Sequence, residues 1–184
     1  MNLWFRLFWY VARTRPRLAE PTEVSRLRFR VWPTDLDFSL HMNNGRYLTL
    51  MDIGRLDVLV ACQVWRAVLS YGWTPIASAV QIRFRRELKA FQRFRLETRL
   101  VAWDKTSVVM EQTFVIEGGA RDGEIAAQAL FKGGLYDRKE RKFIEIAYLM
   151  NGLGVWAESP PLTPEVAAFL NADQTLKTAG RDST

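Results

Sequence analysis

Apolar and polar residues alternate along five stretches of the chain, and one longer stretch repeats at helical spacing. The alternation is clearest over residues 24–32, where Leu27, Phe29 and Val31 define one face and arginines define the other. A period of two is typical of a strand that buries one face. Four later stretches have the same character, and we predict strands at residues 75–84, 94–103, 107–117 and 124–137.

Residues 44–70 predict one long helix. Apolar side chains such as Leu48, Met51 and Leu56 recur there with the spacing of a helix face. Asparagine, which stands at both 43 and 44, is a favoured N-cap residue, and Gly72 is suited to ending the helix. Gly54 lies inside the stretch, and we interpret it as a point where the helix packs closely against a sheet.

The order of strand, helix and four strands predicts an α+β domain. A curved antiparallel sheet of about five strands wraps around one long central helix in this domain. The helix covers the apolar face of the sheet. Asp104 and Lys105 are a candidate two-residue hairpin, and residues 118–123 carry turn chemistry. We assign this domain to residues 22–150.

Two further segments flank the predicted domain. Residues 1–21 form an aromatic and basic N-terminal segment. Residues 151–184 contain a short predicted helix that begins at the proline-rich residues 160–164 and ends at Leu170. A frayed tail of about a dozen residues is predicted at the end of the chain.

The composition is that of a globular protein, with 184 residues, 48% apolar and 25% charged. The single cysteine, Cys62, cannot form an internal disulfide or a thiolate metal cluster, and its place in the helical stretch predicts a buried, inert thiol. These features fit a reducing compartment, and we predict a cytoplasmic protein.

The net charge of +6 favours anionic ligands or a membrane surface as partners. No nucleic-acid module is present in the sequence, so we do not expect nucleic acid to be a partner. Residues 1–17 combine an aromatic stretch with the arginines 13, 15 and 17 that follow it, and they are too short to span a bilayer. Two interpretations remain open: the segment packs on its own domain or a subunit neighbour, or it lies on a membrane as an amphipathic helix.

The reactive side chains of the chain concentrate at the junction between the first strand and the helix. Within thirteen residues lie Asp35, Asp37, the only histidine, His41, and the pair Asn43 and Asn44. Such a junction can direct backbone N–H groups and carboxylates at one small volume. A helix N-terminus stabilises the oxyanion that forms when a carbonyl is attacked, and a carboxylate can attack directly or activate water. This chemistry needs no metal or cofactor.

Each of these residues also has a purely structural interpretation. Aspartates favour turns and caps, which is the preferred role for Asp35 and an alternative for Asp37. His41 alternatively satisfies a buried hydrogen bond, and the two asparagines alternatively cap the helix. Two other carboxylates are less favoured candidates for the reaction: Asp57 and Glu87.

The pattern Asp35-x-Asp37-x-x-x-His41-x-Asn43-Asn44-x-x-Tyr47, followed by Asp52 and Arg55, resembles the signature of the hotdog-fold acyl-CoA thioesterases of the 4-hydroxybenzoyl-CoA thioesterase type. Its variant without glycine is most similar to the group called thioesterase superfamily member six. The resemblance implies a hotdog fold, an acyl-CoA substrate and no cofactor. It also implies a homodimer or a tetramer, because active sites of this family lie at dimer interfaces.

The resemblance also implies roles for individual residues. Asp37 would be the catalytic carboxylate, acting as nucleophile or general base, and the backbone N–H of Asn44 would polarise the thioester carbonyl. His41 and Asn43 would orient the carboxylate or a water molecule. Leu40 stands where catalytic relatives generally have glycine, so a leucine would narrow the thioester channel or shift the turn. The alternative function is a non-catalytic protein that binds acyl thioesters or acts as a scaffold at a membrane.

Substrate contacts are predicted from two groups of residues. Leu40 and Tyr47 adjoin the motif, although Tyr47 could instead form a packing and ion-pair set with Asp52 and Arg55, which share one helix face. Arginine forks suit the phosphates of coenzyme A, and the alternative is an ordinary solvated sheet face. The candidate phosphate contacts are Arg83 and Arg85, with Arg86, Lys89, Arg93 and Arg95 nearby in sequence.

Overall fold

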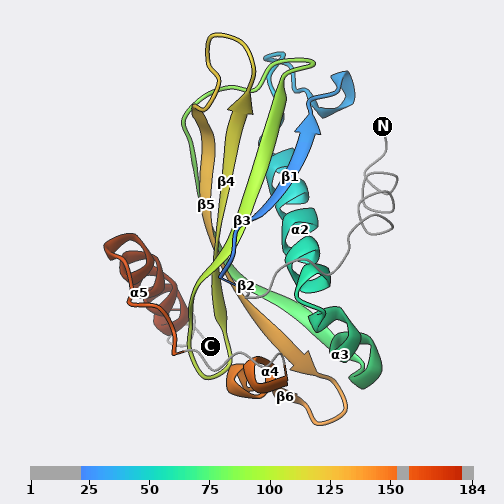
Figure 1. The fold of residues 1–184 in the computed structure, drawn as a ribbon. Coiled ribbons are helices and arrows are strands. Elements are labelled where there is room, and N and C mark those ends of the chain that lie inside the picture. Colours follow the sequence, from blue (N-terminus) through green and yellow to red (C-terminus); the bar gives the residue numbers. More distant parts are fainter. Residues whose placement is uncertain (1–21, 153–157, 180–184) are drawn as a thin grey trace.

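A computed structural model describes residues 22–152 and 158–179 of the chain, which fold as an antiparallel sheet with a long helix along one face (Figure 1). The sheet order is β1-β3-β4-β5-β2, and a short β6 pairs with the end of β5. The strands are β1 (Ser25–Arg30), β2 (Trp73–Phe84), β3 (Arg93–Trp103), β4 (Val108–Glu117), β5 (Ile125–Asp137) and β6 (Lys142–Phe143). The five predicted strands are confirmed, with ends that agree to within two residues.

The predicted single helix is two helices, α2 (Asn44–Ala61) and α3 (Val64–Tyr71). The helix is interrupted between them because Gln63 adopts a left-handed backbone conformation, with φ of 63°. The break turns α3 so that Val64, Ala67 and Val68 pack over the buried Trp73. Gly72 caps α3 in a left-handed conformation, which confirms the predicted end of the helical stretch.

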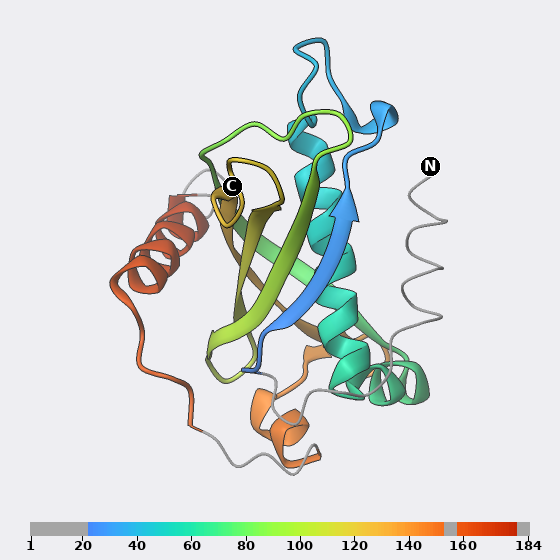
Figure 2. The same cartoon turned by 45° about the horizontal axis from the view of Figure 1, so that its top comes forward.

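The core lies between α2 and the concave face of the sheet, as Figures 1 and 2 show. Leu50 and Met51 of α2 are fully buried against Phe94 and Phe114 of the sheet. Leu27 and Phe29 of β1 face inward while the arginines between them face solvent, as the alternation predicts. This is the α+β arrangement that the sequence pattern predicts, with the helix wrapped by the sheet, and it is the hotdog fold that the family resemblance implies.

Gly54 is the point of closest approach between α2 and the sheet. A Cβ atom at this position would lie 2.6 Å from the Thr98 hydroxyl, 2.8 Å from Leu96 Cδ2 and 2.9 Å from Gln112 Nε2. Gln112 is itself fixed, since its Nε2 donates to the Met51 carbonyl at 3.0 Å. The interpretation of Gly54 as a close-packing residue is therefore confirmed.

Replacing Gly54 with alanine is expected to lower the free energy of unfolding by about 1–3 kcal/mol, because the added methyl group overpacks the helix–sheet contact. Urea unfolding of the two proteins measures the difference. Gly152→Ala is the matched control, since a Cβ there meets nothing within 4 Å. A Gly54→Ala protein as stable as wild type would contradict the expectation.

The C-terminal region departs from the sequence prediction. The short helix that was expected to end at Leu170 is α5 (Pro164–Ala179), so most of the predicted frayed tail is helical. Val166 and Phe169 are buried on the outer face of the sheet, against Ala102 and Val109. No glycine or proline interrupts the chain between Pro164 and Gly180, so a helix anchored by these contacts can continue.

Two smaller features complete the fold. Asp104 and Lys105 do not form a two-residue hairpin, because the β3–β4 turn contains four residues and the Asp104 carboxylate accepts hydrogen bonds from Thr106 and Ser107 N–H. The helix α4 (Ile146–Gly152) follows β6. Within the described ranges, none of the helices is both long and apolar enough to cross a bilayer. Residues 1–17 lie outside those ranges.

Candidate active site

The motif forms a tight hairpin immediately before α2. Leu36 and Met42 form an antiparallel bridge, the Asp37 N–H donates to the His41 carbonyl at 2.9 Å, and the Leu40 N–H donates to the Asp37 carbonyl at 3.0 Å. This is the hydrogen-bond pattern of a three-residue loop, in which the last loop residue is left-handed and is usually glycine. The hairpin places Asp37 at the base of the loop.

Leu40 occupies this glycine-type position and keeps its conformation, with φ of 59°. A left-handed backbone costs a residue with a Cβ roughly 1–2 kcal/mol. The leucine side chain is 70% exposed. The leucine therefore neither shifts the turn nor fills a channel within the protomer.

Leu40→Gly is expected to raise the free energy of unfolding by up to about 1 kcal/mol, since relief of backbone strain exceeds the entropy that glycine adds to the unfolded chain. Chemical denaturation followed by tryptophan fluorescence measures the change. Ser39→Gly in the same loop should lower stability slightly, because Ser39 has no positive φ to relieve. A loss of stability in Leu40→Gly would show that the leucine makes a stabilising contact.

The Asp37 carboxylate belongs to the hairpin that leads into α2. It is partly buried and accepts a hydrogen bond from the Ser39 N–H at 2.9 Å. Asn43 is the N-cap of α2, since its Oδ1 accepts from the Gly45 N–H at 2.8 Å. Among the described residues, the Asn44 N–H has no hydrogen-bond acceptor. A free donor at the first position of a helix carries partial positive charge.

His41 links this hairpin to the loop that follows β2. It forms a bridge with Lys89, and its ring lies close enough to Glu87 to affect that carboxylate. A hydrogen bond from its own backbone N–H, with Arg121, Lys89 and His41 nearby, holds the pKa of Glu87 below its usual range. Glu87 also pairs with Arg121 at 3.3 Å, so it is an ionised, exposed group beside the motif.

Two residues of the motif, Asp35 and Tyr47, are buried and have structural roles. Asp35 is buried, and its Oδ2 accepts from the Trp32 N–H at 2.9 Å while Oδ1 lies 3.7 Å from Arg46 Nε, so the prediction of a capping role is confirmed. Tyr47 is 2% exposed and packs edge-on against Phe84 and Phe114. Burial, with Glu87 as a lesser cause, raises the pKa of Tyr47 to about 12. Tyr47, which was predicted to contact the substrate, therefore has almost no accessible surface in the single chain.

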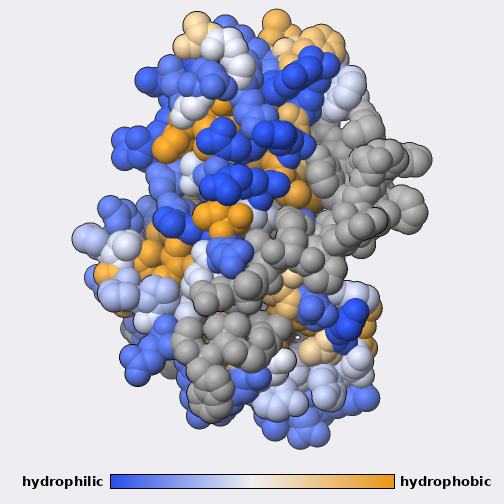
Figure 3. Space-filling view, in the orientation of Figure 1, coloured by the Kyte–Doolittle hydropathy of each residue, from blue (hydrophilic) through white to orange (hydrophobic). Residues whose placement is uncertain are grey.

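The predicted phosphate-binding arginines fall into two groups. Arg83 and Arg85 line a shallow hollow at the end of β2, together with Arg86, which is paired with Glu124 at 3.2 Å. Arg95 pairs instead with Glu97 at 2.9 Å on the outer face of the sheet. That face is largely hydrophilic, with apolar residues visible between the charged ones (Figure 3). The solvated-face interpretation therefore holds for Arg95, while Arg83 and Arg85 stay candidate ligand contacts.

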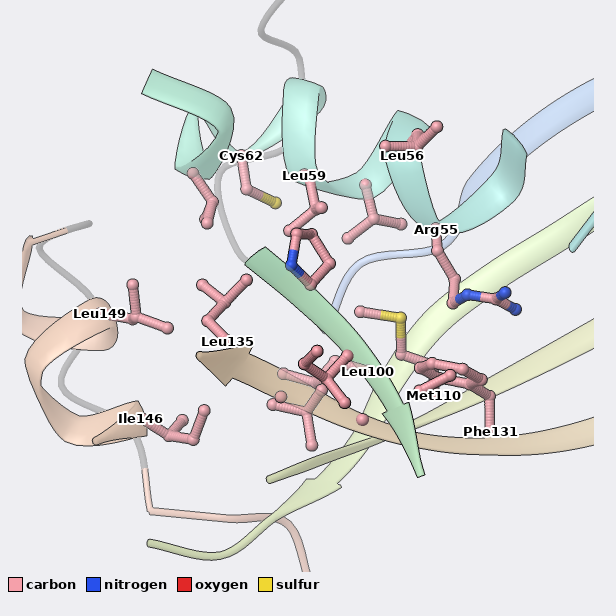
Figure 4. A pocket seen from close by; sticks show the side chains of 18 of the residues that line it. Arg55, Leu56, Leu59, Cys62, Leu100, Met110, Phe131, Leu135, Ile146 and Leu149 are labelled. Atoms are coloured by element: carbon pink, nitrogen blue, oxygen red, sulfur yellow. The ribbon is translucent and has the colours of Figure 1, made fainter. Parts of the chain in front are cut away.

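An apolar cavity of about 310 Å³ lies between the second half of α2 and the sheet, and sequence patterns did not reveal it (Figure 4). Residues from α2, α3, α4 and four strands contribute to its walls. Most of the lining is aliphatic, including Leu56, Leu59, Leu100, Leu135, Ile146 and Leu149. Cys62 is buried and lines the same cavity, as expected for an inert thiol.

A partly buried polar network lies at one end of the cavity. Arg55 stacks over the Phe131 ring at 3.9 Å, donates to Gln112 Oε1 at 2.8 Å and pairs with Asp52, so the predicted ion pair is confirmed. Burial lowers the pKa of Arg55, and the nearby Asp52 carboxylate opposes this effect. Figure 4 places Arg55 and Leu149 at opposite ends of the cavity.

A family model described as the thioesterase-like superfamily matches residues 31–170, which is more than half of the chain. The chain belongs to this superfamily. The match covers the hairpin, α2, the sheet from its second strand onward and the beginning of α5, so it includes the site described above.

The chain is also similar to individual members of this superfamily. It is 39% identical over 85 residues to Protein THEM6 of Xenopus laevis, a match that covers 46% of this chain and 41% of the relative. The chain spans about half the length or less of the curated THEM6 relatives that it matches.

Solved structures show the same fold. The probable thioesterase YbaW of Escherichia coli superposes with a TM-score of 0.63 at 20% identity, covering 70% of this chain and 94% of that one. The 1,4-dihydroxy-2-naphthoyl-CoA thioesterase Slr0204 of Synechocystis superposes with a TM-score of 0.61 at 12% identity, covering 71% and 95%.

Proposed function

We propose that this protein hydrolyses acyl-CoA thioesters to a free carboxylic acid and coenzyme A. The observation that carries the proposal is the Asp37 hairpin directly before α2, whose first N–H, at Asn44, has no acceptor in the described structure. Membership of the thioesterase-like superfamily supports the same reaction.

The proposed chemistry divides the work between a carboxylate and a helix terminus. The Asp37 carboxylate removes a proton from a water that attacks the thioester carbonyl, or attacks the carbonyl itself to form an anhydride that water then hydrolyses. The Asn44 N–H donates to the carbonyl oxygen as it becomes an oxyanion, and collapse of that intermediate breaks the C–S bond and releases the thiolate of coenzyme A, which takes up a proton. A preorganised donor of this kind contributes on the order of 3 kcal/mol of transition-state stabilisation. His41 forms a β-bridge with Lys89, and in this proposal it orients the hairpin and takes no part in the bond-making steps.

We further propose that the site is completed by a second copy of the chain, paired through β2. This strand is an edge of the sheet and exposes Ile76, Val80 and Phe84, a composition suited to association. Antiparallel pairing of two β2 edges about a two-fold axis would set the Phe84 end of one strand beside the Ile76 end of the other. Tyr47 contacts Phe84, and Ile76 lines the cavity, so the start of α2 in one copy would face the cavity of its partner.

The lining of the cavity supports an aliphatic acyl group as the substrate. A pocket of about 310 Å³ lined mainly by leucine, isoleucine and methionine side chains is within the usual range for small-ligand sites, and its polar lining residues are Asp52 and Arg55. Arg83 and Arg85, at the end of β2, are placed to meet the phosphates of coenzyme A in the paired arrangement.

A panel of straight-chain acyl-CoA thioesters, with benzoyl-CoA for comparison, tests the proposal by detection of the released thiol. We expect turnover of the straight-chain substrates and weaker turnover of benzoyl-CoA. Absence of thiol release with every substrate would reject hydrolysis and favour the binding or scaffolding alternative. Light scattering on the same sample tests the dimer.

A further inference from the structure

Helices α3 and α4 and strand β6 lie at the opposite end of α2 from the Asp37 hairpin (Figure 1). Large apolar side chains are exposed there beside a basic turn. The outer side of α3 carries Trp65 and Leu69, and Leu69 is 71% exposed. These residues are one helical turn apart and therefore lie on the same face. We name the aromatic–basic patch by its eight residues: Trp65, Leu69, Tyr71, Tyr148, Arg138, Lys139, Arg141 and Lys142.

The apolar part of the patch is continuous from α3 to α4. The Tyr71 ring stacks on Trp73 at 4.8 Å, and Trp73 contacts Tyr148 of α4 edge-on at 6.1 Å. Tyr71 and Tyr148 are both exposed, while both rings contact the buried indole of Trp73. Tryptophan and tyrosine in such positions are typical of a membrane–water interface.

The basic part of the patch is the turn between β5 and β6, directly beside these rings. Trp73 pairs in register with Asp137, and Asp137 pairs with Lys142 on its other side. The four basic residues of the turn are all exposed, and the acidic residue among them is Glu140, which lies 3.9 Å from Lys142. The turn therefore presents a net positive charge next to an apolar surface.

We propose that the aromatic–basic patch docks the protein on a lipid bilayer with anionic headgroups. Positive charge at the turn complements the headgroups, and Trp65, Leu69 and the two tyrosines enter the interfacial region. The inner sides of the same helices line the apolar cavity through Val64 and Leu149, so docking sets one cavity wall against the membrane surface. This site is separate from residues 1–17 and does not depend on the proposed hydrolysis.

Flotation of the full chain with vesicles tests the proposal, using phosphatidylcholine with and without phosphatidylserine. We expect binding to the anionic vesicles that weakens as salt is added. Two double variants, Trp65→Ala with Leu69→Ala and Arg138→Gln with Lys139→Gln, should each lower the partition coefficient on the order of tenfold.

Matched controls separate the patch from general effects of hydrophobicity and charge. Leu162→Ala with Leu176→Ala removes exposed leucines elsewhere, and Arg30→Gln with Arg93→Gln removes two exposed charges from the sheet face. Both should bind vesicles as wild type does. The proposal is overturned if the wild type does not float, if the patch variants bind normally, or if Trp65→Ala with Leu69→Ala dissociates an oligomer, which would assign the patch to a second copy.

Discussion

Asp37→Asn is expected to lower kcat/KM for a straight-chain acyl-CoA by on the order of 10²–10⁴-fold, the largest effect of any substitution proposed for this chain. The amide can neither attack the carbonyl nor take a proton from water. Its oxygen can still accept the Ser39 N–H, so the hairpin is expected to fold as in wild type. Thiol release under saturating and limiting substrate gives kcat and kcat/KM separately.

Asp35→Asn is the control for this experiment because it makes the same change two residues away. Asp35 is buried, and its carboxylate is already engaged by the Trp32 N–H and by Arg46 in the first turn of α2. We expect this variant to be less stable but to retain kcat. Equal activity of Asp37→Asn and wild type would remove Asp37 from the reaction.

Leu149→Trp should shift the acyl preference towards short chains. Leu149 lies at the end of the cavity furthest from Arg55, and an indole there would occupy space that a longer chain needs (Figure 4). We expect kcat/KM to fall roughly 10–100-fold for chains that fill the cavity and to change little for acetyl-CoA. A series of saturated acyl-CoA substrates measures the shift.

Leu176→Trp provides the comparison, since Leu176 is exposed on α5 away from the cavity. Thermal unfolding of both variants checks that the added indole has not merely destabilised the fold, because overpacking costs about 1–3 kcal/mol. If Leu149→Trp slows acetyl-CoA and long-chain substrates equally, the cavity does not hold the acyl group.

Local sequence patterns were sufficient to predict the five long strands of the sheet. The period-two pattern of β1 and β3 determines which side chains face α2, and the structure keeps that alternation. Gly54 was identified for the same reason, since a glycine inside a helix is costly unless a neighbour needs the space. Predictions of this kind succeed because strand periodicity and close packing depend on side chains that are adjacent in sequence or on one residue type.

Features that depend on distant contacts were not predicted. A glutamine at position 63 does not predict a left-handed backbone. The direction of α3 changes at this residue because the inner face of α3 packs against Trp73. The extent of α5 depends on anchors supplied by β3 and β4. The cavity collects aliphatic residues from seven elements, and such residues look like ordinary core in the sequence.

The candidate site shows the same division. The motif predicted a turn followed by a helix N-terminus, and the structure has a short hairpin that leads directly into α2, while the catalytic role of Asp37 stays a prediction. Tyr47 follows the same motif but is turned into the core by helical periodicity, where Phe84 and Phe114 enclose it.

The position of α5 limits how larger assemblies of this chain can be built. Back-to-back stacking of two sheets would have to lift α5 away, exposing Val166 and Phe169 and breaking the 2.8 Å contact between Lys132 Nζ and Asp173. Any association of this chain through the outer face of its sheet would therefore use the part that α5 leaves uncovered, which includes the arginines of β1 and β3.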